Sequence, residues 1–199
     1  HNGVTYGNST FVTVGFSTIF TSSDGTTWTS RTSGISYNLN GVIYGNSTFV
    51  ATGSLGTILT SSNGTTWDNV TFTYDNGTTT NYTTNSLNDI TYGNSTFVAT
   101  GSSGTILTSS DGTSWDNRTS GRSNTLNGVI YGNSIFVATG SSGTMLSSSD
   151  GTTWDNVTKS TTTLDNGTTV TIKYTTNNLN DITYGNSTFV AVGDSGNIL

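Results

Sequence analysis

The stretch Leu87–Trp115, LNDITYGNSTFVATGSSGTILTSSDGTSW, decides the fold of this chain. Close copies run from His1 to Trp28, from Leu39 to Trp67 and from Leu126 to Trp154, and a fifth copy begins at Leu179 and continues to Leu199. Self-similarity at a regular period is the sequence signature of a repeat architecture. Because the copies cover the chain almost from end to end, we expect one domain over residues 1–199.

Each copy divides into four short segments with the composition of β-strands. In the third copy these segments are residues 87–92, 96–101, 104–109 and 114–119. They are rich in Ile, Val, Phe, Tyr, Trp and Thr, which suit a pleated, half-buried surface. Turn-forming Gly, Asn, Ser and Asp separate them. No stretch has the periodicity of an amphipathic helix, so the sequence predicts essentially no helix.

The linkers that follow the second and fourth copies are long, and each carries Asp-Asn-Gly between strand-forming flanks. These segments are Phe72–Gly77 and Leu164–Tyr174. Asn-Gly between β-formers is the strongest short-range hairpin signal. We therefore expect an extra, protruding hairpin in the second and fourth units, with tips at Asn76 and Asn166. These two hairpins are the candidate contact surface.

Four-stranded units of this period are typical of β-propeller blades. The sequence predicts an all-β fold, a β-propeller of four-stranded antiparallel blades. Four complete blades are expected at residues 1–38, 39–86, 87–125 and 126–178, with a partial fifth blade of three strands at 179–199. A β-solenoid is the alternative, but its coils are usually shorter than this repeat.

Three aromatic residues recur in the repeats and are expected to fill the spaces between blades. They are Tyr6, Tyr44, Tyr92, Tyr131 and Tyr184; Phe11, Phe49, Phe97, Phe136 and Phe189; and Trp28, Trp67, Trp115 and Trp154. Each buried aromatic removes roughly 150–250 Å² from water. At about 25 cal/mol per Å², that is several kcal/mol per residue before entropy.

A turn motif, Ser-Ser-Asp-Gly-Thr-Thr-Trp with small changes, precedes the last strand of the first four units. Its acidic or amide residue and its Trp are Asp24 and Trp28, Asn63 and Trp67, Asp111 and Trp115, and Asp150 and Trp154. The motif resembles the Asp-box, or BNR repeat, of sialidase-type propellers. The wider repeat is similar to bacterial secreted propellers related to photosystem II assembly factors. The motif is one residue shorter than the usual Ser-x-Asp-x-Gly-x-Thr-Trp, and Asn63 stands in place of Asp.

The residues of this motif suit a structural role. A short Asp or Asn side chain can accept hydrogen bonds from N–H groups of its own turn. Gly supplies a positive φ, and Trp packs into the blade. Asn63 is expected to form the same bonds as the three Asp residues. One carboxylate per turn is too few for calcium, so we predict no metal and no cofactor.

The resemblance to sialidases implies an arginine cluster, a Tyr–Glu pair and an acid/base Asp. The chain has no Glu, and its arginines are Arg31, Arg118 and Arg122. Arg31 and Arg118 are equivalent in the repeat, so they are expected in different blades. Several Asp residues also recur with the repeat, at Asp68, Asp116 and Asp155 and at Asp89 and Asp181. We predict no catalytic residues and no enzyme, with hydrolysis by paired Asp left open.

Composition limits the partners. A net charge of −6 with only five Lys and Arg excludes a basic, phosphate-tracking surface, so no nucleic acid is expected. No run of 18 apolar residues is present, so no membrane insertion is expected. The chain has no Cys and its one His is His1, which argues against disulfides, thiolate sites and histidine chemistry. A start at His1 and a stop within a repeat favour a trimmed form of a longer chain.

The sequon Asn-x-Ser/Thr occurs eleven times. Asn63 is set aside because it belongs to the turn motif. The ten candidate N-glycosylation sites are Asn8, Asn46, Asn69, Asn76, Asn81, Asn94, Asn117, Asn156, Asn166 and Asn186. Most fall in predicted turns, outer strands or hairpin tips, where a glycan would be exposed.

These observations favour a non-catalytic, glycosylated propeller, secreted or at the cell surface, that acts as an adhesion, scaffold or fibre-forming module. The partial fifth blade would leave a strand edge that a second copy could complete, giving self-association. Glycans and surface proteins are further candidate partners. A carbohydrate-binding lectin is the alternative, with Tyr37, Tyr74, Tyr82 and Tyr174 available to stack on sugars. A glycoside hydrolase is the third possibility.

Overall fold

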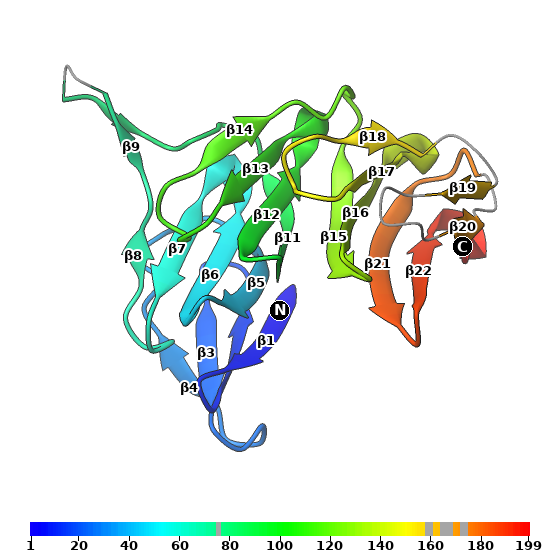
Figure 1. Ribbon diagram of the computed structural model, residues 1–199. Helices are drawn as coiled ribbons and strands as arrows, with labels where there is room; N and C mark the ends of the chain where they lie inside the picture. Colours follow the sequence, from blue (N-terminus) through cyan, green and yellow to red (C-terminus); the bar gives the residue numbers. More distant parts are fainter. Residues whose placement is uncertain (75–76, 158–160, 164–168, 172–174) are drawn as a thin grey trace.

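The computed structural model describes residues 1–74, 77–157, 161–163, 169–171 and 175–199, with the backbone alone at 161–163 and 169–171. Its strands form separate antiparallel sheets that fan out along an open arc (Figure 1). Within the described residues, four sheets have four strands in sequential order and three sheets have two. No helix in this part of the chain is long and apolar enough to cross a membrane.

Five of these sheets correspond to the five sequence repeats. The first sheet contains β1 (Gly3–Gly7), β2 (Thr10–Val14), β3 (Ile19–Ser22) and β4 (Thr29–Arg31), and the second contains β5 (Leu39–Gly45), β6 (Thr48–Gly53), β7 (Ile58–Ser61) and β8 (Asp68–Asn69). The third contains β11 (Leu87–Gly93), β12 (Thr96–Gly101), β13 (Ile106–Ser109) and β14 (Asp116–Arg118), and the fourth contains β15 (Leu126–Gly132), β16 (Ile135–Gly140), β17 (Met145–Ser148) and β18 (Asp155–Asn156). The fifth contains β21 (Leu179–Gly185) and β22 (Thr188–Gly193).

The two extra hairpins predicted from Asp-Asn-Gly are present. One pairs β9 (Phe72–Thr73) with β10 (Thr79–Thr80), and the other pairs β19 (Thr161–Thr163) with β20 (Thr169–Thr171). The β9–β10 hairpin extends from the body of the arc (Figure 1). The predicted tips, Asn76 and Asn166, lie outside the described residues.

In each of the five repeat sheets, the first two strands are joined by a turn with two consecutive left-handed residues. In the third sheet these are Asn94, with φ 45°, and Ser95, with φ 56°. A two-residue turn with positive φ at both positions matches the twist of the strands that it joins. Asn tolerates this conformation better than most residues, because its short polar side chain suits the left-handed region. The repeated Gly-Asn-Ser sequence therefore fixes the register of the strand pair.

Four 3₁₀ turns are the only helical elements in the described residues: η1 (Ser54–Gly56), η2 (Ser102–Gly104), η3 (Ser141–Gly143) and η4 (Asp194–Gly196). Each is three residues long, which agrees with the prediction of essentially no helix, but together they correct the prediction of a third strand beginning at Gly104, since β13 begins at Ile106. Gly104 has a φ of +68°, and the Thr105 hydroxyl donates to the Ser102 carbonyl at 2.7 Å. This tight turn takes the residues that were expected to start the strand.

Neighbouring sheets stack through two unlike faces. In the contact between the third and fourth sheets, the third contributes Val98 and Ile106, whereas the fourth contributes Tyr131, Phe136 and Trp154. Equivalent residues form the contacts of the first sheet with the second and of the second with the third. In the contact of the fourth sheet with the fifth, Val137 and Met145 pack with Phe189, and there is no equivalent tryptophan. We name these surfaces the aliphatic face, the equivalents of Val98 and Ile106, and the aromatic face, the equivalents of Tyr131, Phe136 and Trp154. Burial of these aromatics together with the aliphatic residues of the clusters stabilises the stacked sheets.

The prediction that the aromatics are buried between sheets is confirmed inside the arc and is wrong at its start. Phe49, Phe97 and Phe136 are fully buried. Tyr6 and Trp28, in the first sheet, are 57% and 39% exposed. Their side chains project from the aromatic face of the first sheet, which no other described sheet covers.

The fifth unit is smaller than expected. Three strands were predicted over residues 179–199, but the third is reduced to a single bridge between Val192 and Ile198, with paired hydrogen bonds between Ala191 and Leu199. The sheet itself consists of β21 and β22.

Candidate functional site

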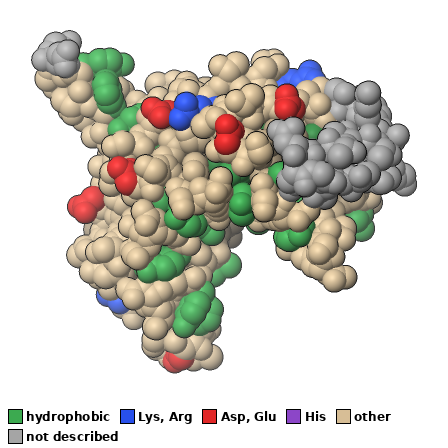
Figure 2. Space-filling model, viewed as in Figure 1, with side chains coloured by type: hydrophobic (Ala, Val, Ile, Leu, Met, Phe, Trp, Pro, Cys, Tyr) green, Lys and Arg blue, Asp and Glu red, His purple; other side chains and the backbone are tan. Residues whose placement is uncertain are grey.

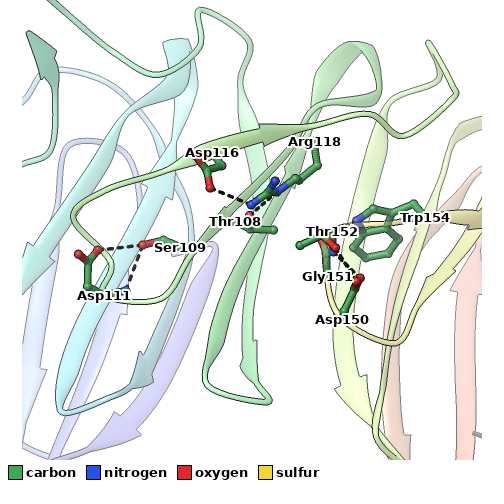
Figure 3. Close-up of polar contacts among 9 residues, drawn as sticks. All are labelled: Thr108, Ser109, Asp111, Asp116, Arg118, Asp150, Gly151, Thr152 and Trp154. Atoms are coloured by element: carbon green, nitrogen blue, oxygen red, sulfur yellow. Dashed lines mark hydrogen bonds and ion pairs between the residues drawn. The ribbon is translucent and has the colours of Figure 1, made fainter.

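The Ser-Ser-Asp-Gly turns are closed by their own side chains. In the third sheet, Asp111 Oδ1 accepts hydrogen bonds from the backbone N–H groups of Thr113 at 2.7 Å and Ser114 at 2.8 Å. The Ser109 hydroxyl donates to Asp111 at 3.0 Å (Figure 3). It also accepts from the Gly112 N–H at 2.8 Å. These bonds satisfy the donors of the turn, so the carboxylate acts as part of the backbone structure.

The tryptophan of each turn completes this arrangement. Trp115 Nε1 donates to the Gly112 carbonyl at 2.9 Å, and Trp154 Nε1 donates to the Gly151 carbonyl at the same distance. Trp28 and Trp67 make the equivalent bonds to Gly25 and Gly64. The indole therefore ties the start of the turn to its end, and the rings of Trp67, Trp115 and Trp154 also pack on the preceding sheet.

Asn63 forms the same turn as the three aspartates. Its Oδ1 accepts from the N–H groups of Thr65 at 2.8 Å and Thr66 at 3.1 Å, and from the Ser61 hydroxyl at 3.3 Å. One side-chain oxygen thus suffices, and the negative charge is not required for this geometry.

Hydrogen bonds hold the turn carboxylates in the ionised form. Backbone N–H donors from Thr27 and Thr26 lower the pKa of Asp24 far below its usual range. The Ser114 N–H lowers the pKa of Asp111, and the Thr152 hydroxyl followed by the Thr153 N–H lowers that of Asp150. A carboxylate with a depressed pKa is a poor general acid at neutral pH.

An open groove of about 650 Å³ lies beside the turns of the third and fourth sheets. Its lining includes Thr71, Phe72, Tyr82, Trp115, Arg118 and Asp150, and we name it the inter-sheet groove. Figure 3 shows Arg118 on one side and the Asp150–Thr152 pair on the other. The inter-sheet groove therefore combines aromatic surface with charges of both signs.

Arg118 is held in place within its own sheet. Its Nε donates to the Thr108 hydroxyl at 2.8 Å, and its guanidinium pairs with Asp116 at 2.8 Å. This is the one ion pair found in the described part of the chain. Arg31 makes the equivalent bond to Thr21 in the first sheet. The expected separation of Arg31 and Arg118 is therefore confirmed, since the second sheet lies between theirs.

Three aromatic side chains meet on and beside the β9–β10 hairpin. Phe72 lies 4.9 Å from Tyr74 and 6.0 Å from Tyr82, measured between ring centroids. Phe72 and Tyr74 are 42% and 53% exposed. Of the four tyrosines proposed to stack on sugars, Tyr74 and Tyr82 are thus brought together, Tyr37 is exposed elsewhere, and Tyr174 lies outside the described residues. Phe72 belongs to the hairpin that the sequence marked as a candidate contact surface, but the sequence did not predict this aromatic cluster.

Asp89 is the carboxyl with the most unusual surroundings in the described residues. Its Oδ2 accepts the Val129 N–H of the next sheet at 2.8 Å, and its Oδ1 accepts the Ile90 N–H at 2.8 Å. The residue is half-buried as a whole, and the carboxylate is the part withdrawn from water. This desolvation raises the pKa of Asp89 to about 7, against the effect of both N–H donors. The sequence pattern showed its recurrence with Asp181 but not this inter-sheet contact.

The candidate glycosylation sites are mostly exposed. Those on the exposed surface are Asn8, Asn46, Asn69, Asn94, Asn117, Asn156 and Asn186. Asn81 is half-buried, and its amide nitrogen donates to the Leu55 carbonyl at 2.7 Å. A glycan at Asn81 would replace that bond. Among the residues that the structure describes, no cluster of three His, Cys, Asp or Glu is placed to hold a metal ion.

The separate four-stranded sheets arranged along an arc define a protein with the β-propeller fold. Comparison with solved structures supports this class. Across 98% of this chain, YCF48 bound to D1 peptide superposes with a TM-score of 0.67 at 17% identity, and YCF48 from Cyanidioschyzon merolae with 0.65 at 14%. The WD40 propeller domain of Doa1 superposes over the whole chain with a TM-score of 0.65 at 12% identity.

These likenesses show the fold. The chain spans 60–66% of the length of those three structures. A fourth match is the extracellular domain of the hybrid two-component system BT4673 from B. thetaiotaomicron, with a TM-score of 0.66 over 26% of that chain. No known protein family matches the sequence, and neither does any curated protein. The resemblance to photosystem II assembly factors is thus supported at the level of the propeller fold.

Proposed function

We propose that this protein is a non-catalytic propeller module, with four complete blades and a partial fifth, that acts outside the cell or at its surface in adhesion, scaffolding or fibre formation. The observation that carries the proposal is the use of the turn carboxylates. Asp24, Asp111 and Asp150 are bonded within their own turns and have lowered pKa values. The Asp-box resemblance fits this structural use, which recurs from blade to blade.

The location and glycosylation form part of the same proposal. Seven sequon asparagines are exposed on turns and outer strands, as glycan attachment requires. At one of them, Asn46, a glycan would replace the hydrogen bond from Nδ2 to the Ser110 carbonyl at 3.2 Å. Surface labelling of intact source cells, followed by intact-mass measurement before and after deglycosylation, tests both. We expect labelled protein that loses mass on deglycosylation. Protein that is protected from the label and carries no glycan would contradict the proposal.

A carbohydrate-binding lectin is the second candidate, and the inter-sheet groove favours it. Aromatic rings stack on the apolar faces of sugars, while polar groups such as Arg118 and Asp150 can bond to hydroxyls. A glycan array with the wild type and with Tyr82→Ala separates the two candidates, with Tyr37→Ala as the control. The lectin predicts a sugar signal that only Tyr82→Ala removes, whereas the scaffold predicts no sugar-specific signal.

A peptide or surface protein is the partner that a scaffold requires. YCF48 has been solved with a bound D1 peptide, so this fold can present a peptide site. The exposed Phe72 and Tyr74 are the surface proposed here for such contact. A glycoside hydrolase would need a proton donor, and Asp89 has a suitable pKa but is bonded to Val129 of the next blade. We expect no turnover of chromogenic sugars.

A further inference from the structure

The two ends of the arc present opposite halves of the contact that joins its sheets. The fifth sheet exposes its aliphatic face, on which Val190 is 36% and Ile198 68% exposed. Their equivalents in the third sheet, Val98 and Ile106, are fully buried by the fourth sheet. The aliphatic face of the fifth sheet is therefore built like a buried one.

The first sheet exposes the complementary aromatic face. Val4 is 66% exposed, whereas its equivalents Val42 and Val129 are 6% and 3% exposed. Tyr6 and Trp28 lie on the same face. Figure 2 shows hydrophobic side chains gathered on the part of the molecule formed by the first sheet.

At each contact inside the arc, a glycine of one sheet lies against a tyrosine ring of the next sheet, and this pair fixes how the two sheets are aligned. A Cβ built on Gly7 would fall 2.0 Å from the ring of Tyr44 in the next sheet, and one on Gly132 would fall 2.3 Å from Tyr184. Gly45 and Gly93 bear the same relation to Tyr92 and Tyr131. At the two ends of the arc each member of this pair lacks its partner: a Cβ built on Gly185 has nothing within 4 Å, and Tyr6 is exposed.

The asparagine hydrogen bonds between neighbouring sheets also lack their partners at the ends of the arc. Asn127 Nδ2 donates to the Leu179 carbonyl of the following sheet at 2.8 Å, and Asn2, Asn40 and Asn88 make equivalent bonds. Asn180, at the same position in the fifth sheet, instead donates to Asp194. A first sheet placed after the fifth would offer Asn180 the His1 carbonyl.

We propose that the aliphatic face of the fifth sheet binds the aromatic face of the first sheet of a second copy, with Tyr6 of that copy over Gly185. This deepens the proposed structural role by giving self-association a mechanism, the stacking of sheet faces, distinct from strand addition at the sheet edge. The contact is heterologous, so each copy keeps one free face of each kind and assembly proceeds head to tail.

Gly185→Ala is the sharpest test of this contact. The added methyl group meets nothing within 4 Å in a single copy, and Gly185 does not have a positive φ. In the assembly the same methyl group would collide with the Tyr6 ring. By sedimentation velocity over a wide concentration range, we expect the wild type to form larger species. Gly185→Ala should associate at least about tenfold more weakly with an unchanged unfolding curve, and Tyr37→Ala should behave as the wild type.

Mixing two variants tests the direction of assembly. Val4→Asp blocks the aromatic face and leaves the aliphatic face intact, whereas Gly185→Ala does the reverse. Each variant alone should remain monomeric, and an equimolar mixture should form a 1:1 dimer and nothing larger. A wild type that is monomeric at every concentration, or a Gly185→Ala variant that associates as the wild type does, would overturn the proposal. Neither result depends on glycans or cell location, so failure here is distinguishable from failure of the proposed function.

Discussion

The ring of Tyr131 lies against the backbone of Gly93, so close that a Cβ on Gly93 would fall 2.0 Å from Tyr131 Cγ. The residues belong to neighbouring sheets, and the same pair recurs at each of the four sheet-to-sheet contacts. Only a residue without a side chain can stand at this position, since a Cβ cannot approach a ring atom within 3 Å. The pair therefore fixes both the spacing and the register of the stacked sheets.

The asparagine bonds between sheets should contribute measurably to stability. Asn88→Ala removes a bond of 2.9 Å to the Leu126 carbonyl and leaves a partly buried acceptor without its donor. We expect the free energy of unfolding to fall by about 1–2 kcal/mol. Asn180→Ala removes a bond to the exposed Asp194 of the same unit; it is the matched control and should cost less. Urea denaturation measures both, and equal losses would contradict an inter-sheet role for Asn88.

The turn residues should tolerate exchange of Asp and Asn but not loss of the side-chain oxygen. Asp111→Ala leaves the N–H groups of Thr113 and Ser114 without an acceptor, so we expect a loss of about 1–2 kcal/mol. Asp111→Asn and Asn63→Asp retain that oxygen and should each change stability by less than about 1 kcal/mol. Thermal unfolding tests the series, and a large loss in Asp111→Asn would show that the charge is required.

Three buried hydroxyls offer a route to higher stability. The Oγ1 atoms of Thr52, Thr100 and Thr139 are buried with no protein partner. The equivalent residue of the first sheet is Val14, which is fully buried, so the position accepts a methyl group. Because an unpaired buried hydroxyl costs about 1–3 kcal/mol, we expect Thr100→Val to raise the free energy of unfolding by about 1 kcal/mol. Thr100→Ser, which keeps the hydroxyl, should give no gain; a destabilised Thr100→Val would mean that the hydroxyl has a partner.

Stability should decline as the pH rises from about 4 to 7. Burial raises the pKa of Asp89 to about 7, whereas an unfolded Asp titrates near 4. Between these values the folded state binds more protons than the unfolded state, so the free energy of unfolding falls as the pH increases. The turn carboxylates act oppositely, because their lowered pKa values remove stability as the pH falls below about 4.

Substitution of Asp89 isolates its part in this profile. Asp89→Asn should abolish the decline between pH 4 and 7, and Asp68→Asn, at an exposed position, should leave it intact. Urea midpoints across the pH range measure the slope. A decline that persists in Asp89→Asn would assign it to other groups.

The sequence predicted the features that form within a single repeat. The Asn-Ser turns, the strand order and the closed Ser-Ser-Asp-Gly turns depend on residues within a few positions of one another, so a single repeat contains the information. The extra hairpins were predicted from Asp-Asn-Gly for the same reason.

What the sequence did not predict depends on neighbours from other sheets. The Asp89 contact with Val129 joins residues forty positions apart, and the Tyr82 hydroxyl of the linker donates to the Thr113 carbonyl in the turn of the third sheet. The exposure of Tyr6 and Trp28 follows from their place in the arc, since their equivalents one repeat later, Tyr44 and Trp67, are partly buried against the first sheet.

The most direct test of the stacking account is the unfolding free energy of Gly132→Ala compared with that of Gly185→Ala, measured in urea on dilute protein. The two glycines hold the same place in their sheets, but a Cβ at Gly132 would lie 2.3 Å from the Tyr184 ring, whereas one at Gly185 would meet nothing within 4 Å. We predict a loss of about 1–3 kcal/mol for Gly132→Ala and no loss for Gly185→Ala. Equal effects in the two variants would contradict the claim that tyrosine–glycine contacts hold the sheets together.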